Sequence, residues 1–535
     1  MLIFLLLANT YFIRSIEWKA YDLGLLFSSV KPANKDIVVV AIDDRSLQLH
    51  GAWPWPRNIL ADATRELTKA RPDVIGFSLP FDAEQNSSGL DQTEKLREAL
   101  VASKSMRGKV KKEFRSLQST LLADQVLASR FGSSGRIVLA MPFSRGIKQQ
   151  GIQSETFPEY LDKFTLQNVS QLNASEADSS LSEDNSVPVA EIVYPPIEIL
   201  SKQVGGVGVI SLGDDNLELA RREPLIVRYA DKYLPSFALM LAVRHQRLAT
   251  SRISAHLGDR LELAGKTLET DRQLHIYPRY YKQQDNEPAF KVYSMADVLN
   301  GSVPNASLRN KIIIVGVTSR QHVTPVLTPI GEAMSPPMVI AHSVSSLLNS
   351  ELYKAPDWTR MVQVLSIIGI GLYLMFLLPR FANGTGLVIS LFIMFAIFNV
   401  HFYFMISEST WIPLMGALLT LLSGHLLIAT RHLVQNKIAQ VYNELSEANM
   451  QLAESFHSQG KLDKAFEKYR SCRIDQPLLH QIYNLGLDYE RKRQFNKAVS
   501  VFEFIESNDS DIKGLDERLR HNREAANTVV LSGTS

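Results

Sequence analysis

A small group of acidic, aromatic and basic residues is the first candidate for a ligand-binding site. Its members are Asp43, Asp44, Trp53, Trp55, Arg57 and His342. Asp43 and Asp44 follow an apolar run, and the carboxyl ends of strands are where α/β sheets place their ligands. Trp53 and Trp55 would form a wall of the same site. The group therefore predicts ligand binding at one edge of a sheet.

Each of these residues also has a structural explanation. Turn aspartates commonly bond their own backbone, so Asp43 would cap the next turn. Asp44 would then pair with Arg45 or Arg57, and the Pro-Trp turn would pack on the core. His342 has no second histidine four residues later, which favours a buried, hydrogen-bonded histidine over a metal ligand.

Sequence motifs of known catalytic and metal sites are missing. The chain has no GxxxxGK[ST] phosphate loop, no HRD with DFG and no HExxH. Gly205-Gly206-x-Gly208 lacks the spacing and the strand-to-helix setting of a dinucleotide loop, so it predicts a turn. The single cysteine, Cys472, excludes a CxxC site, and we expect it to pack. The prediction is a protein without catalytic activity, cofactor or metal.

The candidate residues lie in a stretch, 14–357, that predicts an α/β domain. Nearly all-apolar runs, typical of strands covered on both faces, are Asp36–Ile42, Val74–Leu79, Arg136–Ala140, Val207–Ser211, Leu225–Val227 and Lys311–Val317. The helices expected between them are Arg57–Ala70, Leu90–Ser129, Ser236–Leu248, Ser294–Leu299 and Val339–Leu348. This alternation predicts helices on a mixed sheet. Residues 144–187, rich in Gln, Asn, Ser and Glu, predict a mobile insertion.

Three long apolar segments within 358–430 predict an all-α membrane hairpin. The segments 361–378, 384–406 and 411–430 contain no Asp, Glu, Lys or Arg. Each is close to the ~20 residues that a helix needs to cross a bilayer. Because the connections between them are so short, core helices of a soluble domain are excluded.

Basic residues predict the orientation of this hairpin. Arg380 lies in its first turn, Arg431 and Lys437 follow its last span, and its second turn has only Glu408. Since Lys and Arg mark the cytoplasmic side, residues after 430 should be cytoplasmic and 14–357 periplasmic. An outer domain without disulfides suits a bacterial periplasm. We therefore expect a multi-pass protein of the bacterial inner membrane, in contact with lipid.

Residues 1–13, MLIFLLLANTYFI, predict an N-terminal transmembrane helix that enters from the cytoplasm. The run is short for a span, and Arg14 would serve as a snorkelling anchor. A cleaved signal peptide is the alternative. It is disfavoured because the basic n-region and the small-x-small cleavage site are missing.

Short motifs in the α/β stretch are similar to one known family. They are Glu17…Tyr21-Asp22, Asp43-Asp44-x-Ser46, Gly51-x-Trp53-Pro54-Trp55-Pro56-Arg57, Tyr233–Ala238, Lys311–Thr318 and Pro337-Met338-Val339-x-x-His342. These motifs resemble the type-2 CHASE sensory domain, and the likeness covers roughly residues 15–350 and continues through the hairpin. The resemblance implies an extracellular sensor of an unknown ligand, of the kind found in bacterial cyclases, histidine kinases and serine/threonine kinases.

The segment 431–452 predicts a helix that continues from the last span. Apolar residues recur there at the a and d spacing of a heptad: Val434, Ile438, Val441, Leu445, Ala448 and Leu452. Two interpretations stay open. One is a coiled-coil stalk of a homodimer, and the other is a single amphipathic helix that packs on the next domain.

A repeat with a period of 33 residues follows within 446–510. Its positions include Leu452, Phe456 and Tyr469 in the first copy and Leu485, Gly486, Tyr489 and Ala498 in the second. The spacing resembles tetratricopeptide repeats, which implies that these residues belong to an all-α, partner-binding module. Two repeats are fewer than the usual three or so, so the module should lean on a neighbouring helix or a partner. Residues 525–535 are expected to be disordered.

These features together predict a non-catalytic receptor. Residues 431–535 are too few for a kinase or cyclase domain, so a periplasmic signal would pass through 431–452 to repeats that hold a separate cytoplasmic enzyme. The alternative is a membrane scaffold of the cell envelope. A third possibility, a periplasmic hydrolase, requires Asp43, Asp44 and His342 to converge. The net charge of +2 and the basic run 107–115, interrupted by Glu113, give no sign of nucleic-acid binding.

Overall fold

The structure is a computed structural model that describes residues 11–85, 122–144, 157–171, 187–211, 221–283, 288–381, 383–508 and 514–532. It divides into two compact units, Met1–Leu378 with Val388–Leu421 and Pro379–Leu387 with Leu422–Ser535. Several predicted features lie outside the described residues. They are most of the N-terminal span 1–13, most of the helix 90–129, the basic run 107–115 and two parts of the insertion 144–187.

A mostly parallel sheet forms the centre of the first unit, as the apolar runs predict. Its strands are β1 (Ile37–Ile42), β2 (Val74–Phe77), β3 (Ile137–Ser144), β5 (Ile192–Val193), β6 (Gly206–Ser211), β14 (Lys291–Ser294) and β15 (Ile312–Val317). Their order is β14-β1-β15-β2-β3-β5, with β6 also paired to β3. The pairs are parallel apart from β3 with β5. Strands β1 and β15 are buried along their whole length, which is what two covered faces require.

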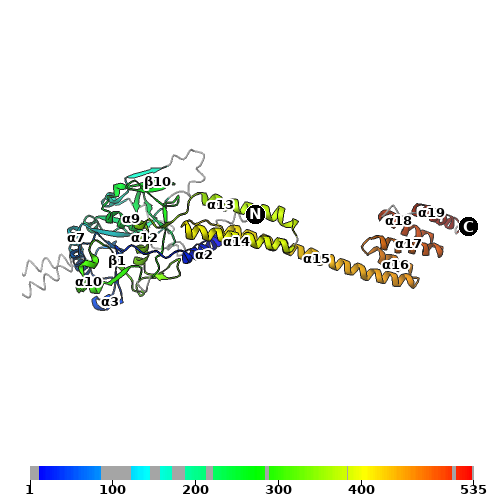
Figure 1. Cartoon of the computed structure of the whole chain (residues 1–535), viewed down its shortest axis with the longest axis horizontal. Helices are drawn as coiled ribbons and strands as arrows, with labels where there is room; N and C mark the ends of the chain where they lie inside the picture. The colour runs from blue at the N-terminus through cyan, green and yellow to red at the C-terminus, as the bar shows by residue number, and fades with distance from the viewer. Residues whose placement is uncertain are drawn as a thin grey trace, which may run out of the picture. The chain divides into compact units, whose positions relative to one another are not determined.

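Helices cover both faces of the sheet (Figure 1). Those of the first face are α4 (Arg57–Lys69), α7 (Ala123–Ser134) and α10 (Met295–Leu299), and those of the second are α9 (Phe237–His245) and α12 (Pro336–Asn349). Side chains alternate along each strand, so Val38 and Val40 join the first core while Ile37 and Val39 join the second. The predicted α/β domain is confirmed.

The remaining elements of this domain are short, and apart from the strand that overlaps the apolar run Leu225–Val227 they carry no clear sequence pattern. The helices are α3 (Asp44–His50), α8 (Glu198–Ser201) and α11 (Asn305–Leu308), and the strands are β4 (Asn168–Gln171), β7 (Glu223–Pro224), β8 (Ile226–Tyr229), β9 (Lys232–Pro235), β10 (Ile253–Leu257), β11 (Arg260–Leu263), β12 (Lys266–Leu268), β13 (His275–Pro278), β16 (Val326–Leu327), β17 (Ala333–Met334) and β18 (Leu352–Tyr353). Inside the expected mobile insertion, β4 pairs with β10, and the 3-10 helix Glu159–Phe164 buries Leu161 and Phe164. This part of the segment is ordered because its apolar side chains join the first core.

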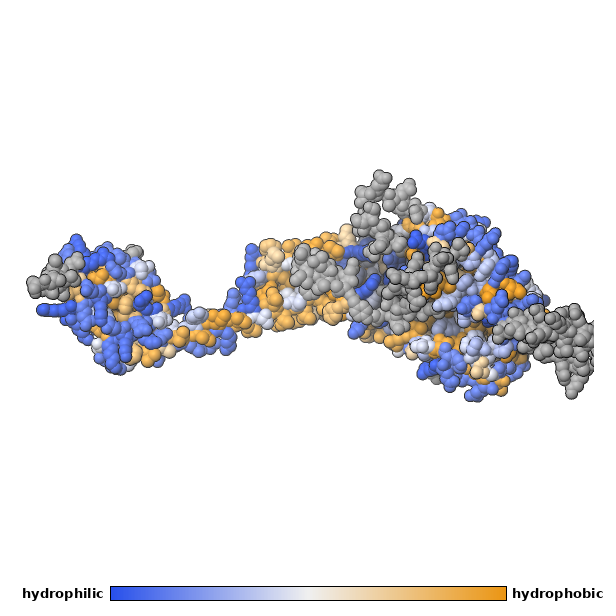
Figure 2. Space-filling model, turned by 180° about the vertical axis from the view of Figure 1, so that it is seen from behind, coloured by the Kyte–Doolittle hydropathy of each residue, from blue (hydrophilic) through white to orange (hydrophobic). Residues whose placement is uncertain are grey.

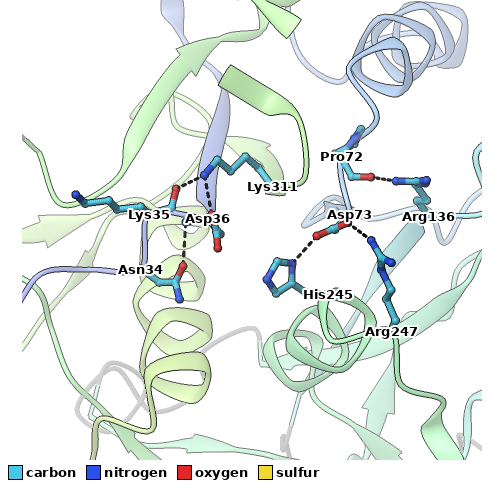
Figure 3. A network of polar contacts seen from close by, with 9 residues as sticks. All are labelled: Asn34, Lys35, Asp36, Pro72, Asp73, Arg136, His245, Arg247 and Lys311. Carbon is cyan, nitrogen blue, oxygen red and sulfur yellow. Dashed lines mark hydrogen bonds and ion pairs between the residues drawn. The ribbon is translucent and has the colours of Figure 1, made fainter. Parts of the chain in front are cut away.

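Ion pairs tie the strands together at their amino ends (Figure 3). Asp36, just before β1, accepts a hydrogen bond from Lys311 beside β15, at 2.6 Å. Asp73, just before β2, lies 3.3 Å from His245 Nδ1 and 3.5 Å from an Arg247 nitrogen, both near the end of α9. The first contact joins the ends of β1 and β15, and the second joins the start of β2 to the end of α9.

Three helices are long and apolar enough to cross a membrane in the described part of the chain: Trp358–Arg380, Gly384–Ser407 and Met415–Ser458. They contain α13 (Trp358–Leu372), a π turn at Tyr373–Leu377, α14 (Asn383–Ser407) and α15 (Met415–Ser458). The structure thus has three apolar helices of membrane length where the sequence predicts them. The third begins at Met415 rather than Trp411, because the residue before Pro413 is disfavoured in a helix. Figure 2 shows the hydrophobic surface around these helices.

An additional helix, α2 (Tyr11–Phe27), contains the last residues of the predicted N-terminal span and continues fourteen residues beyond Ile13. Its Ile16 and Ala20 pack with Ile412, Leu414 and Met415 at the start of α15. The first unit therefore includes a contact between α2 and the membrane-length helices.

Four helices follow α15 among the described residues of the second unit. They are α16 (Leu462–Arg470), α17 (Gln476–Arg491), α18 (Phe495–Asn508) and α19 (Leu515–Ser532). The period of 33 is repeated in the backbone, because the turn residues Gly460 and Arg493 both have positive φ, 73° and 58°. The small residues Ala465 and Ala498, also 33 apart, are both fully buried. We call α16–α19, with the end of α15, the helical module.

The C-terminal tail differs from the prediction. Residues 525–532 are part of α19 rather than disordered. Leu515, Leu519 and Asn522 are buried at helical spacing, and Ala526 continues the same face. A packed face extends this helix where the composition alone indicates disorder.

Candidate functional site

Asp43 lies at the carboxyl end of β1, where the sequence places it, and its carboxylate is engaged by the fold. Its Oδ1 accepts hydrogen bonds from the Ser46 backbone N–H at 2.9 Å, the Ser46 hydroxyl at 2.6 Å and the Ser294 hydroxyl at 2.8 Å. Burial raises the pKa of Asp43, but these hydrogen bonds outweigh it and leave the pKa below its ordinary value. Asp43 is thus the N-cap of α3 and joins β1 to the end of β14.

The other residues of the predicted site are divided between several contacts. Asp44 is exposed, and Arg45 pairs with Asp297 of α10 through both carboxylate oxygens, at 3.0 and 3.1 Å. Arg57 pairs instead with Asp124, with its Nε 3.4 Å from the carboxylate. The guanidinium also covers the Phe81 ring at 4.5 Å. The expected pairing of Asp44 with either arginine does not occur among the described contacts.

Both tryptophans of the Pro-Trp turn pack on the first core. Trp55 is buried, and its Nε1 donates to the Gly51 carbonyl at 2.8 Å. Trp53 lies against it edge-on, with ring centroids 6.1 Å apart. The structural explanation of this turn is therefore the one the contacts favour.

His342 lies elsewhere, within α12 on the second face of the sheet. It is fully buried, and its Nδ1 accepts from the Tyr281 backbone N–H at 3.1 Å. The imidazole stacks on Tyr281 and meets Phe290 edge-on. Burial lowers the pKa of His342 to about 3, so the ring is neutral. Because the sheet separates α12 from α3 and α10, His342 does not converge with the aspartates, and the hydrolase arrangement is not formed.

A different group of residues connects the sheet domain to the membrane-length helices. We call it the junction cluster, and its buried members are Trp18, Tyr21, Leu25, Tyr277, Tyr353 and Met405, with Trp411 packed against them. Trp18 stacks on Trp411 at 4.7 Å between centroids, and Tyr21 meets both Trp411 and Tyr353 edge-on. Aromatic contacts of this kind stabilise by roughly 0.5–1.5 kcal/mol beyond area burial. The cluster therefore joins α2 to β13, β18 and the segment before α15.

Charged side chains bind the same helix to the sheet domain. Arg221, beside β7, donates to both carboxylate oxygens of Asp22 at 2.8 and 2.7 Å, and its guanidinium lies over the Trp18 ring at 5.8 Å. Bidentate arginine–carboxylate pairs combine strength with fixed geometry. Two residues later, burial raises the pKa of Glu223 from its ordinary value of 4.5 to about 7. This carboxyl therefore titrates near neutral pH close to the junction.

On its other side α2 contacts the start of α15. The buried Glu17 accepts a hydrogen bond from the Gly416 backbone N–H at 2.9 Å, so its carboxyl group lies at the first turn of α15 and satisfies one of the helix's free N–H groups. His401 of α14 lies between two backbone carbonyls, 3.0 Å from that of Ile412 and 3.3 Å from that of Ala20. Helix α2 thus contacts the sheet domain, α14 and α15.

The model of the CHASE2 domain matches residues 1–377. The chain belongs to the CHASE2 family. No curated protein and no solved structure matches it. CHASE2 is an extracellular sensory domain, which is consistent with a sensor role. The domain and the three membrane-length helices together indicate a membrane protein.

The CHASE2 match covers α2, whose residues are not among the predicted ligand-binding residues. Glu17, Tyr21 and Asp22 are in the motifs that resemble the family, yet the sequence offers no reason to pair Asp22 with Arg221, 199 residues away. The available signal is chemical: two acidic residues within a helix that follows an apolar segment need partners. Among the described residues, no group of three or more His, Cys, Asp or Glu could hold a metal ion.

The predicted partner-binding residues of the helical module divide into two classes. Tyr469, Leu485, Gly486, Tyr489 and Ala498 form its buried core. Leu452 is exposed and Phe456 is partly buried at the edge of the core. The buried residues hold the helices of the module together. A partner would therefore contact exposed side chains instead. Cys472 packs in the same core.

We expect Asp43→Ala to destabilise the CHASE2 domain by about 1–2 kcal/mol, because it removes the N-cap of α3 and leaves Ser46 and Ser294 without their acceptor. The neighbouring Asp44→Ala is the matched control and should change stability by less than about 0.5 kcal/mol, since Asp44 is exposed. Thermal unfolding of the two purified variants measures the difference. A larger loss for Asp44→Ala would show that the exposed carboxylate is the important one.

Proposed function

We propose that this chain is a non-catalytic receptor of the bacterial inner membrane. Its CHASE2 domain lies in the periplasm and responds to a ligand there. Its helical module lies in the cytoplasm and holds a separate signalling enzyme, a kinase or cyclase. The orientation rests on the excess of Arg and Lys at Arg380, Arg431 and Lys437 over the other hairpin turn.

The observation that carries this proposal is the pair of contacts made by one helix, α15. Its first turn donates to Glu17 of α2 through Gly416, and its last turns bury Ala453 in the core of the helical module. Arg221 holds α2 to the sheet domain through Asp22. A ligand that displaces α2 would therefore move the start of α15, and shifts of about 1–2 Å at helix interfaces are a known means of signalling.

The enzyme partner is inferred from the architecture of the module and of the family. Helix pairs with a 33-residue period, such as the equivalent turns at Gly460 and Arg493, are typical of tetratricopeptide-like modules that bind proteins. CHASE2 domains usually precede a kinase or cyclase, whereas the described residues after 431 form the helical module. A separate enzyme is thus proposed by family analogy.

Capture of the full-length protein from crosslinked native membranes tests this function. We expect a kinase or cyclase among the recovered proteins, and we expect Gly486→Leu to reduce its recovery at least tenfold. A side chain at Gly486 would lie 2.6 Å from the Phe502 ring and would break the packing of the module. Asp44→Ala, exposed in the other unit, is the control and should leave recovery unchanged.

Other results would favour the alternative function. Envelope-assembly proteins in place of a signalling enzyme, retained by wild type and lost with Gly486→Leu, would indicate a membrane scaffold. Protease resistance of the CHASE2 domain in each variant shows that the loss arises in the module. A partner that binds equally to Gly486→Leu would contradict the assignment of binding to the helical module.

A further inference from the structure

An apolar stripe runs along α15 after the hydrophobic part of the third span. Its members are Val434, Ile438, Val441, Leu445, Ala448 and Leu452. The large side chains of this stripe are between 46% and 59% exposed, although this part of the helix follows the charged residues Arg431 and Lys437. Figure 2 shows hydrophobic side chains along the same helix. Exposed apolar surface of this kind marks an interaction site.

The helical module packs on a different face of α15. Ala453 is fully buried in the core of the module, and Met450 and Phe456 pack against that core. His457 lies 2.8 Å from the Asp488 carboxylate of α17. With Ile438, Leu445 and Leu452 at heptad position a, Ala453 is at b and Phe456 is at e. Met450 and His457 are at f. The module therefore leaves the a and d face open.

We propose that a second copy of this chain covers the stripe, as the other strand of a parallel coiled coil. The dimer goes beyond the proposed function and needs only that α13, α14 and α15 span a membrane. Apolar side chains that recur at a and d over about three heptads, with a mean spacing of 3.5 residues, match a supercoiled partner helix.

Membrane anchoring makes a second copy the fitting occupant. Two chains with the same orientation in one membrane present their α15 helices parallel and at the same depth, so identical heptads meet in register. The flanking positions also agree, because the exposed Lys437 at g would face the exposed Tyr442 at e of the other copy. No like charges are brought together by this pairing.

The length of the stripe fits an anchored dimer. About three heptads would associate weakly as a free peptide, since association costs several kcal/mol of lost freedom. Confinement of both chains to one membrane reduces this cost by raising their effective concentration. The dimer would place two helical modules side by side, so a dimeric enzyme could bind both at once.

Cysteine crosslinking of the full-length protein in native membranes tests the dimer. In a Cys472→Ser background, we introduce single cysteines on the stripe, Val441→Cys or Ala448→Cys, and at the controls Ala439→Cys and Asn443→Cys, which are positions b and f. After oxidation with copper phenanthroline, we expect at least tenfold more disulfide-linked dimer at the stripe positions. Adding Leu445→Glu should reduce the Val441→Cys dimer at least fivefold.

Three results would overturn the proposal. Equal crosslinking at all four positions would indicate random collision, and greater crosslinking at Ala439 or Asn443 would place the contact on another face. Absence of dimer at the stripe, in protein that retains a protease-resistant CHASE2 domain, would show that another molecule or lipid covers the seam. None of these readings depends on the enzyme partner, so failure of the proposed function leaves the test of the dimer valid.

Discussion

Gly208→Ala is expected to lower the melting temperature of the CHASE2 domain by about 4 °C. A Cβ at this position in β6 would lie 2.6 Å from the Cα of Phe237, 2.8 Å from its N and 2.8 Å from the Ser236 carbonyl oxygen. All three atoms belong to the backbone at the start of α9, so no side chain can move aside. Overpacking of this kind costs about 3 kcal/mol, and in a domain of roughly 340 residues each kcal/mol shifts the melting temperature by about 1.4 °C.

Gly206→Ala in the same strand is the matched control. Its Cβ would meet the Met240 methyl carbon at 2.7 Å and a Val138 methyl group at 3.3 Å. Methionine is flexible, so the contact can be relieved by a small rotation. We expect a loss of less than about 1 kcal/mol, measured on both variants by thermal unfolding in detergent. Equal stability of the two variants would mean that α9 can move away from the sheet at little cost.

Arg221→Gln is expected to increase amide hydrogen exchange in α2 about 30-fold while leaving the exchange of β1 and β15 unchanged. The substitution removes the bidentate pair with Asp22 and leaves that carboxylate half-buried without its partner. Breaking a buried pair costs about 3–5 kcal/mol. The side chains here are 13% and 21% exposed, so we discount this to about 2 kcal/mol, which is a factor of about 30. Local opening of α2 is what exchange measures.

Two controls separate this local effect from general destabilisation. Arg272→Gln removes an ion pair with Asp357 whose side chains are 44% and 55% exposed, and it should change exchange by about twofold or less. The double variant Asp22→Asn with Arg221→Gln should recover part of the loss, because no unpaired charge remains. If amide exchange in α2 were similar in Arg221→Gln and wild type, the Asp22–Arg221 pair would not hold α2 in place and would have no role in signal transfer.

Local patterns account for the elements that the sequence predicts. The strands β1, β2 and β15 are nearly continuous apolar runs, and such runs have few alternatives to a sheet covered on both faces. The three spans follow from length and the absence of charge. The antiparallel strands β10, β11 and β12 are short, and their weak alternation is indistinguishable from loops without the partner strands.

The candidate site shows the same division between local and distant information. The cap by Asp43 on Ser46 spans three residues, so the choice between ligand contact and cap was visible in the sequence. The Ser294 hydroxyl at the end of β14 also donates to this carboxylate. The sequence does not reveal that contact, because the two residues are 251 positions apart. His342 and Asp43 both lie in family motifs, and only the sheet that separates α12 from α3 shows that they do not meet.

The sequence by itself determined the α/β domain, the three membrane-length helices, the CHASE2 family and the 33-residue period, because each depends on composition or spacing within a few tens of residues. The tertiary structure alone decided the junction cluster. Glu17 and Gly416 are 399 residues apart, and Asp22 and Arg221 are 199 apart. No periodicity connects such residues; their pairing follows from the strand order and from the burial of polar groups, which must find partners wherever the fold places them.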